Sequence, residues 1–333
     1  MMRKSRRELL KIMGFTAGGV LLQSFLAACG RKPALDGAIQ PGSESNSAAA
    51  TATLVKPTAT PYNGPDLVVV RDGEPEQLVQ KALEALGGMG RFVQTGARVV
   101  IKPNMCVSYN SYEYASTTNP WVVGALVKLC LDAGAKSVKV LDYPFSGTSD
   151  RAYETSGVQE QVVAAGGEME VISHLKFVPV EIPDAVMLKE VKAYQDALEA
   201  DVLINVPIAK QHSLARLTLG MKNLMGLLAS RGSLHANLRE CLPDLVTLFK
   251  PTLTVVDAVR ILTKNGPTGG SLDDVKKLDT VIASPDIVAA DSYATSLFDL
   301  TPMDIPYIKS AIERGIGRGD LENLKIEEYS LKS

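Results

Sequence analysis

Short runs of β-branched and other apolar residues recur along this chain, and segments with a helical pattern separate them. Runs such as Val99-Val100-Ile101 and Val202-Leu203-Ile204 are apolar at every position, which is typical of strands that are covered on both faces. We predict strands over residues 67–71, 98–101, 137–141, 201–205, 253–256 and 280–283. Their alternation with helices predicts an α/β fold on a mostly parallel, doubly wound sheet, in one domain or in two lobes.

Two of the predicted helices have clear start signals. Asn119-Pro120 and Ser284-Pro285 each place a capping residue directly before a proline, which is well tolerated in the first turn of a helix. We predict helices over residues 75–86, 120–134, 188–198, 285–297 and 305–314.

The first 28 residues have the pattern of an export signal. Arg6 and Arg7 precede an apolar stretch over residues 12–28, which is shorter than the roughly 20 apolar residues that a spanning helix needs. The paired arginines resemble the twin-arginine signal, and Leu26-Ala27-Ala28-Cys29 resembles the lipobox of bacterial lipoproteins. The alternative is a plain N-terminal anchor helix.

The two signal resemblances imply a lipid-anchored, extracytoplasmic protein of the cell envelope. They imply export by the twin-arginine translocase through Arg6 and Arg7, and acylation of Cys29. One acyl chain binds a membrane only marginally, so several chains on Cys29 would form the anchor. Residues 29–64 are rich in Ala, Ser, Thr and Pro and hold little to bury. We therefore expect a disordered tether there, followed by an α/β domain over residues 65–333.

The charge of the chain is uneven. Residues 1–28 hold five basic and one acidic residue, so the remaining residues hold 30 basic and 36 acidic residues. Nucleic-acid recognition needs a clustered basic surface, so this mildly acidic composition argues against a nucleic-acid partner. The four cysteines include no CxxC pair and lack ferredoxin spacing. The sequence therefore predicts no iron–sulfur cluster, and it identifies no other cofactor.

Polar residues follow several of the predicted strands. Lys102 and Asn104 follow the strand over residues 98–101, Asp142 follows the strand over 137–141, and Lys210 and His212 come shortly after residue 205. Ligands bind beyond the carboxyl ends of strands in open parallel sheets, so we expect these side chains at one edge. In extended backbone, residues i and i+2 point the same way, so Lys210 and His212 could face one ligand.

Five blocks of the sequence resemble the domain of unknown function 362 family. They are residues 101–104, 203–213, 220–226, 254–257 and 266–270, and the likeness runs in order over roughly residues 65–328. The most specific part is Lys210-Gln211-His212 together with Lys222-Asn223. The family has no established activity, so the resemblance implies no substrate. Some members carry a ferredoxin-type cysteine segment, and this chain departs from that pattern.

From these residues we predict a site for an anionic small molecule. Lys210 and His212 are the candidate catalytic residues, because Lys supplies a positive charge and His transfers protons near neutral pH. The candidate ligand-binding residues are Lys102, Asn104, Lys222, Asn223, His235, Gly269 and Gly270. The two glycines could form a nest of backbone N–H groups for an anion, or they could belong to a flexible surface loop.

The sequence holds only weak candidates for metal ligands. Asp257 and Asp286 follow predicted strands, and carboxylates suit a hard cation. Asp286 could instead stabilise the N-terminus of the helix that it precedes.

Two classes of function fit these residues. The first is an exported enzyme in which Lys102, Lys210 and Lys222 hold carboxylate or phosphate oxygens while His212 acts as acid or base. The alternative is a non-catalytic lipoprotein that binds a solute or a partner. The residues alone do not decide between them.

Overall fold

A computed structural model describes residues 62–332. The predicted signal peptide over residues 1–28, with Arg6 and Arg7, lies outside the described residues, and so do Cys29 and residues 30–61 of the predicted tether. The described residues belong to one compact unit, so of the two arrangements expected the structure has one domain rather than two lobes.

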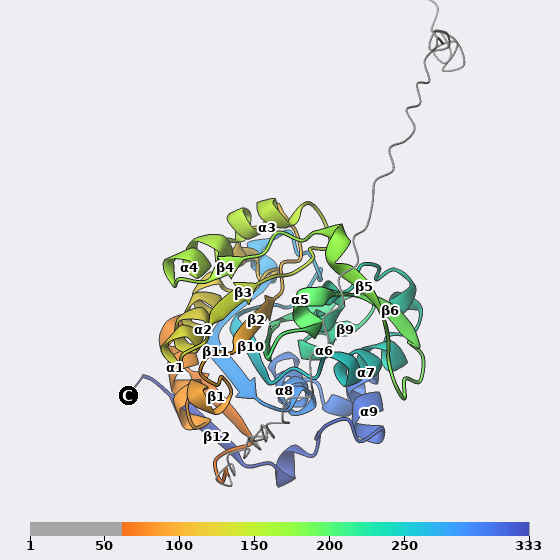
Figure 1. Ribbon diagram of the computed structural model, residues 1–333. Helices are drawn as coiled ribbons and strands as arrows, with labels where there is room; N and C mark the ends of the chain where they lie inside the picture. Colours follow the sequence, from red (N-terminus) through yellow and green to blue (C-terminus); the bar gives the residue numbers. More distant parts are fainter. Residues whose placement is uncertain (1–61, 333) are drawn as a thin grey trace, which may run out of the picture. The chain divides into compact units, whose positions relative to one another are not determined.

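A ten-stranded sheet runs through the described part of the chain (Figure 1). Its main path has the order β12-β1-β11-β10-β7-β2-β3-β4, and β8 and β9 extend it beside β10. The strands are β1 (Leu67–Arg71), β2 (Arg98–Pro103), β3 (Ser137–Val140), β4 (Glu168–Met169), β7 (Val202–Val206), β8 (Ile208–His212), β9 (Arg216–Thr218), β10 (Leu253–Leu262), β11 (Val275–Ser284) and β12 (Ile326–Ser330). A separate antiparallel pair consists of β5 (Phe177–Glu181) and β6 (Glu190–Tyr194).

Most neighbouring strands of the large sheet are parallel. β10, β7, β2, β3 and β4 pair in parallel in that order, whereas β11 is antiparallel to both β1 and β10. This arrangement confirms the predicted α/β class with a largely parallel sheet.

Helices cover both faces of the sheet (Figure 1). They are α1 (Pro75–Ala85), α2 (Pro120–Asp132), α3 (Ser149–Ser156), α4 (Val158–Ala164), α5 (Gln195–Leu198), α6 (Gly220–Asn223), α7 (Leu238–Phe249), α8 (Ile287–Ala294) and α9 (Pro306–Glu313). Side chains of β1 alternate between two cores: Val68 and Val70 belong to the core that includes residues of α1 and α2, and Leu67 and Val69 belong to the core that includes residues of α7 and α8. The apolar runs are therefore continuous because both faces of each strand are buried.

The predicted helix over residues 188–198 is wrong. Residues Glu190–Tyr194 form β6, which pairs with β5, and only Gln195–Leu198 form a short helix. Lys and Ala favour helices intrinsically, but pairing with β5 buries Ala193 and Tyr194, and such tertiary contacts override local propensity. Lys192 accordingly lies on a strand, where it is exposed.

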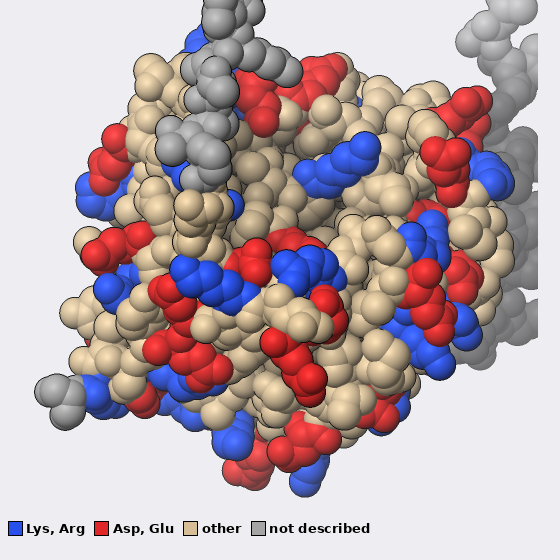
Figure 2. All heavy atoms as spheres, turned by 90° about the horizontal axis from the view of Figure 1, so that it is seen from below, with Lys and Arg blue, Asp and Glu red and all other residues tan. Residues whose placement is uncertain are grey.

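None of the helices in residues 62–332 has the length and apolar character that a membrane crossing requires. On the face seen in Figure 2, acidic and basic side chains are interspersed.

Candidate functional site

A cavity of about 760 Å³ lies near the carboxyl ends of β2, β3 and β8. Seven of the predicted site residues line it: Lys102, Asn104, Lys210, His212, Lys222, Asn223 and His235. Asp142, Tyr143, Arg231 and Cys106 also line it. The cavity therefore brings together side chains from positions 102 to 235, which the strand ends hold at one edge of the sheet.

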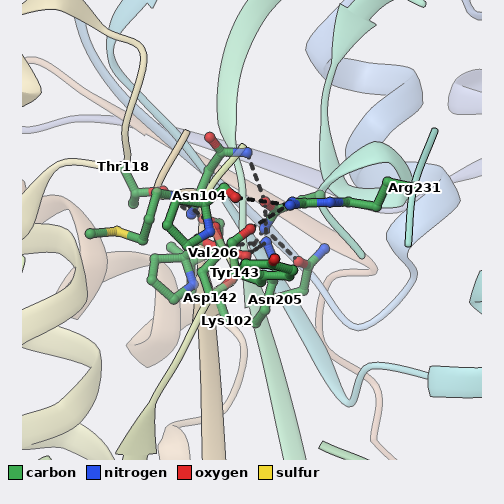
Figure 3. A network of polar contacts seen from close by, with 12 residues as sticks. Lys102, Asn104, Thr118, Asp142, Tyr143, Asn205, Val206 and Arg231 are labelled. Carbon is green, nitrogen blue, oxygen red and sulfur yellow. Dashed lines mark hydrogen bonds and ion pairs between the residues drawn. The ribbon is translucent and has the colours of Figure 1, made fainter. Parts of the chain in front are cut away.

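Lys102 is held in a buried ion pair. Its Nζ lies 2.7 Å from Asp142 Oδ1 (Figure 3). It also donates to Asn223 Oδ1 at 2.7 Å. The other carboxylate oxygen, Asp142 Oδ2, accepts a hydrogen bond from the backbone N–H of Met105 at 2.7 Å. Burial lowers the pKa of Lys102 to about 8 even though Asp142 opposes that shift. The positive charge of Lys102 is therefore matched within the protein.

Asn223 connects the segments that form the floor of the cavity. Its Oδ1 accepts from Lys102 and from Asn104 Nδ2, the latter at 2.9 Å. Its Nδ2 donates to the backbone oxygen of Lys102 at 3.1 Å and to Asn205 Oδ1 at 2.9 Å. These bonds fix the amide in one orientation, because its oxygen receives donors and its nitrogen faces acceptors. Asn104 and Asn223 thus position the lysines.

Lys210 lies on β8 and is almost completely buried, like Lys102. Its Nζ donates to the backbone oxygens of Ser116 at 2.7 Å and Pro267 at 3.0 Å, and to Asn104 Oδ1 at 3.1 Å. Burial lowers the pKa of this lysine. All three acceptors are neutral, so no carboxylate bonded to Lys210 offsets its charge.

Lys222 and Arg231 add two more positive charges to the cavity. Among residues 62–332, the Lys222 ammonium makes neither a hydrogen bond nor an ion pair. Burial, reinforced by the nearby charge of Lys210, lowers its pKa to about 8. Arg231 donates only to backbone oxygens, those of Tyr143 at 2.6 Å and Pro144 at 2.8 Å. The Lys210, Lys222 and Arg231 charges therefore lack a carboxylate partner in the described part of the chain.

The two histidines of the cavity lie next to each other with nearly parallel rings. The ring centroids of His212 and His235 are 6.2 Å apart, and the ring planes are inclined by 26°. Burial, followed by repulsion from Lys222 and Lys210, lowers the pKa of His212 to about 3. Burial and Lys222 also lower the pKa of His235. Both rings are therefore neutral near pH 7.

The remaining predicted residues lie outside the lining of the cavity. Pro267 and Thr268 line it, but Gly269 and Gly270 do not, and the Gly269 N–H donates to the backbone oxygen of Asn265 at 3.0 Å. That N–H is used within its own loop, so it does not contribute to the nest of donors that the glycines suggested.

The two aspartates proposed as metal ligands have structural partners. Asp257 is fully buried and accepts from the N–H groups of Asn119 at 2.7 Å and Val259 at 3.0 Å. Asp286 caps α8 by accepting from the N–H groups of Val288 and Ala289. Within residues 62–332, no group of three or more His, Cys, Asp or Glu side chains is arranged to hold a metal ion.

Some residues of the cavity were not among the candidate site residues predicted from the sequence, although Asp142 was expected at the same edge of the sheet. Asp142 follows a predicted strand, and that signal was available, but its pairing with Lys102 depends on the neighbouring positions of β2 and β3. Arg231 has no motif of its own. Cys106 resembles any small apolar core residue in sequence, whereas in the structure its Sγ lies 3.5 Å from the same Pro267 oxygen that Lys210 contacts.

These features define an α/β protein with a positively charged cavity at the carboxyl ends of its strands. The chain belongs to the family described as "Domain of unknown function (DUF362)", which matches residues 99–296. That range includes every candidate residue of the cavity and is shorter than the resemblance expected from the sequence blocks.

Comparison with individual proteins supports the membership. A thylakoid-associated protein of Synechocystis sp. is 30% identical over 249 residues, which cover 70% of this chain and 73% of that protein.

Two solved structures are also similar. The lactate racemase apoprotein of Thermoanaerobacterium thermosaccharolyticum matches 64% of this chain and 53% of its own, with 12% identity and a TM-score of 0.40. A protein from Thermotoga maritima matches 68% of this chain and 60% of its own, with 12% identity and a TM-score of 0.37. This chain thus spans less than two thirds of either solved structure.

Proposed function

We propose that this protein is a membrane-tethered, extracytoplasmic enzyme that binds and converts an anionic small molecule in the cavity. The observation that carries this proposal is the set of unmatched charges on Lys210, Lys222 and Arg231. Holding cations in a buried place without a counter-charge destabilises the folded protein, and a bound anion relieves that destabilisation.

Catalysis, rather than binding alone, is supported by the state of Lys222. A pKa of about 8 lets its amine exchange a proton near neutral pH, and it makes no hydrogen bond to the described residues that would restrain it. Groups with pKa values near the working pH are effective in proton transfer. We propose that Lys222 transfers a proton to or from the bound anion. Lys210 and Arg231 would hold the charge of that anion.

The location rests on the N-terminal sequence and on one relative. The twin-arginine pattern of Arg6 and Arg7 and the lipobox that ends at Cys29 support export and lipid anchoring. The name of the Synechocystis relative, a thylakoid-associated protein, supports an association with membranes.

A thermal-shift screen with orthophosphate, pyrophosphate, citrate and malonate tests the binding step. An anion at a hundred times its Kd stabilises the protein by about 2.7 kcal/mol, and for a domain of this size each kcal/mol raises Tm by roughly 2–4 °C. Lys222→Met should reduce the shift, because it removes one of the three unmatched charges of the cavity. Lys192→Met should keep it, because Lys192 is exposed on β6 and outside the cavity.

Two outcomes would contradict the proposal. If no anion stabilises the wild-type protein, the cavity does not bind anions. If the Lys192 variant loses as much of the shift as the Lys222 variant, the stabilisation arises at the surface. Anions that do bind are then incubated with the protein and analysed by NMR. An anion that binds and is recovered unchanged supports the alternative, a solute-binding lipoprotein.

A further inference from the structure

The hydrogen bonds of His212 determine which of its nitrogens carries the proton. Its Nδ1 accepts from the backbone N–H groups of Leu214 at 3.1 Å and Ala215 at 3.3 Å. A nitrogen that accepts N–H donors carries no proton itself, so the proton of the neutral ring is on Nε2. His212 is 5% exposed and lines the cavity. It therefore offers a hydrogen-bond donor there.

The hydrogen bond of His235 determines the opposite arrangement. Its Nδ1 lies 3.0 Å from the backbone oxygen of Arg231, which only accepts, so Nδ1 carries the proton. The Nε2 of the neutral ring then has a free lone pair. His235 belongs to the 3₁₀ turn Ser233–Ala236 and lines the same cavity. It therefore offers an acceptor.

The surroundings of the two rings keep both of them neutral. The positive charges of Lys222 and Lys210 help to lower the pKa of His212, and those of Lys222 and Arg231 help to lower the pKa of His235. Among the described residues that line the cavity, the one carboxylate is that of Asp142, and it is paired with Lys102. Among residues 62–332, neither Nε2 atom has a hydrogen-bond partner. One donor and one acceptor thus remain free beside three unmatched cations.

We propose that His212 and His235 recognise a hydroxyl group on the anionic ligand. A hydroxyl both accepts and donates, so it can receive the Nε2–H of His212 and donate to Nε2 of His235. Ring centroids 6.2 Å apart are close enough for one small molecule to contact both rings. The ligand class is therefore a hydroxylated carboxylate or phosphate. This inference rests on the proposed function, because the cations hold the anionic group.

The tautomers themselves are measurable without any ligand. The chain has three histidines, so ¹⁵N NMR of the protein labelled on histidine, with His174→Asn to identify the third signal, resolves both rings. At pH 7 we expect His212 protonated on Nε2 and His235 protonated on Nδ1. Two rings of the same tautomer, or a charged ring at that pH, would overturn the inference.

Matched ligand pairs test recognition of the hydroxyl. Glycerate is compared with propionate, and glycerol 3-phosphate with propyl phosphate, by calorimetric titration. We expect the hydroxylated member of at least one pair to bind about tenfold or more tightly, because its absence leaves buried polar groups without partners. The pair that shows this preference identifies the anionic group as carboxylate or phosphate.

Three histidine variants complete the test. His212→Asn keeps an acceptor near the Nδ1 position and removes Nε2, and His235→Asn keeps a donor near its Nδ1 and removes Nε2. Each should reduce the preference for the hydroxyl to about one while propionate or propyl phosphate still binds. His174→Asn should leave the preference unchanged, because His174 lies outside the cavity.

The two proposals fail in different ways. If anions bind but the hydroxylated and plain members bind equally, the hydroxyl inference is wrong and the proposed function stands. If neither these ligands nor the anions of the thermal-shift screen bind, both proposals are wrong.

Discussion

The Nζ of Lys102 lies 2.7 Å from Oδ1 of Asp142, and the two side chains are 1% and 4% exposed. This buried ion pair distinguishes Lys102 from Lys222, although the sequence predicts both lysines for the same site. Lys102 has a counter-charge within the protein, and Lys222 makes no ion pair among the described residues. The two lysines should therefore respond in opposite ways to the same substitution.

Lys102→Met should destabilise the protein. The substitution leaves the Asp142 carboxylate buried without its cation, and breaking a buried pair in this way costs about 3–5 kcal/mol. Urea unfolding monitored by circular dichroism measures the loss. An unchanged unfolding midpoint would show that the ion pair does not contribute to stability.

Lys222→Met should stabilise the ligand-free protein at pH 7 by about 1–2 kcal/mol, because it removes a partly buried charge with no partner. The pKa of Lys222 is about 8 in the folded protein and 10.5 in the unfolded chain. Below pH 8 both states hold the proton and the folded state bears the full penalty. Between pH 8 and 10.5 the folded state releases the proton while the unfolded state keeps it, so the stability of the wild type rises with pH.

The pH dependence supplies the check on that prediction. The advantage of Lys222→Met over the wild type should be largest below pH 8 and should disappear as the pH approaches 10.5. Thermal denaturation of both proteins at pH 7, 8, 9 and 10 measures the difference. An advantage that does not change with pH would mean that the methionine acts through packing.

Gly226→Ala should disrupt the ion pair between Lys102 and Asp142. A Cβ at this position would lie 1.9 Å from Asp142 Oδ1 and 2.7 Å from Lys102 Nζ. The pair would have to move, and we expect a loss of about 1–3 kcal/mol, as for other insertions into well-packed sites. Gly232→Ala is the matched control, because its Cβ would meet no atom within 4 Å and its φ is −59°. Equal unfolding midpoints for the two variants would contradict this explanation.

Cys106 should be the most reactive of the three cysteines at positions 106, 130 and 241. It lines the cavity and shares the Pro267 oxygen with Lys210, whereas burial raises the pKa of Cys130 to about 12 and also raises that of Cys241. Since the cavity is positively charged, it should attract the anion iodoacetate. The ratio of the alkylation rate with iodoacetate to the rate with neutral iodoacetamide should therefore be higher for Cys106 than for glutathione. Peptide mass spectrometry after brief labelling identifies the site. Labelling of Cys130 before Cys106 would contradict the prediction.

The N-terminal signals make a prediction about location. Replacing Arg6 and Arg7 together by Lys should block export, because the transport signal depends on the guanidinium pair. Cys29→Ala should yield a protein that is exported but unanchored or unprocessed. Cell fractionation and immunoblotting measure both. Normal membrane anchoring of the Cys29→Ala protein would disprove lipidation.

The local sequence pattern was sufficient to predict strands where both faces of the strand are buried, because such burial requires apolar residues at every position. The runs around Val100 and Leu203 are continuously apolar for that reason, and they are strands β2 and β7. The extended backbone expected at Lys210 and His212 is β8. The pattern gave a wrong prediction around Lys192, because pairing with β5 outweighs the helix propensity of residues 188–198.

The charge balance of the cavity could not be predicted from sequence. The positions of Lys102 and Asp142 do not reveal that one neutralises the other, because that depends on the pairing of β2 with β3. The tautomers of His212 and His235 likewise depend on backbone groups around each ring, and the residue types do not specify those groups.

Lys210 also has a consequence for how the domain is assembled. Its ammonium group binds three segments that lie 106, 94 and 57 positions away along the chain. Contacts of such long range require large loops to close, which costs conformational entropy. We therefore expect the cavity to form only after most of the domain is in place. A fragment that lacks any one of the three segments leaves this ammonium without one of its acceptors, so the complete cavity requires the whole domain.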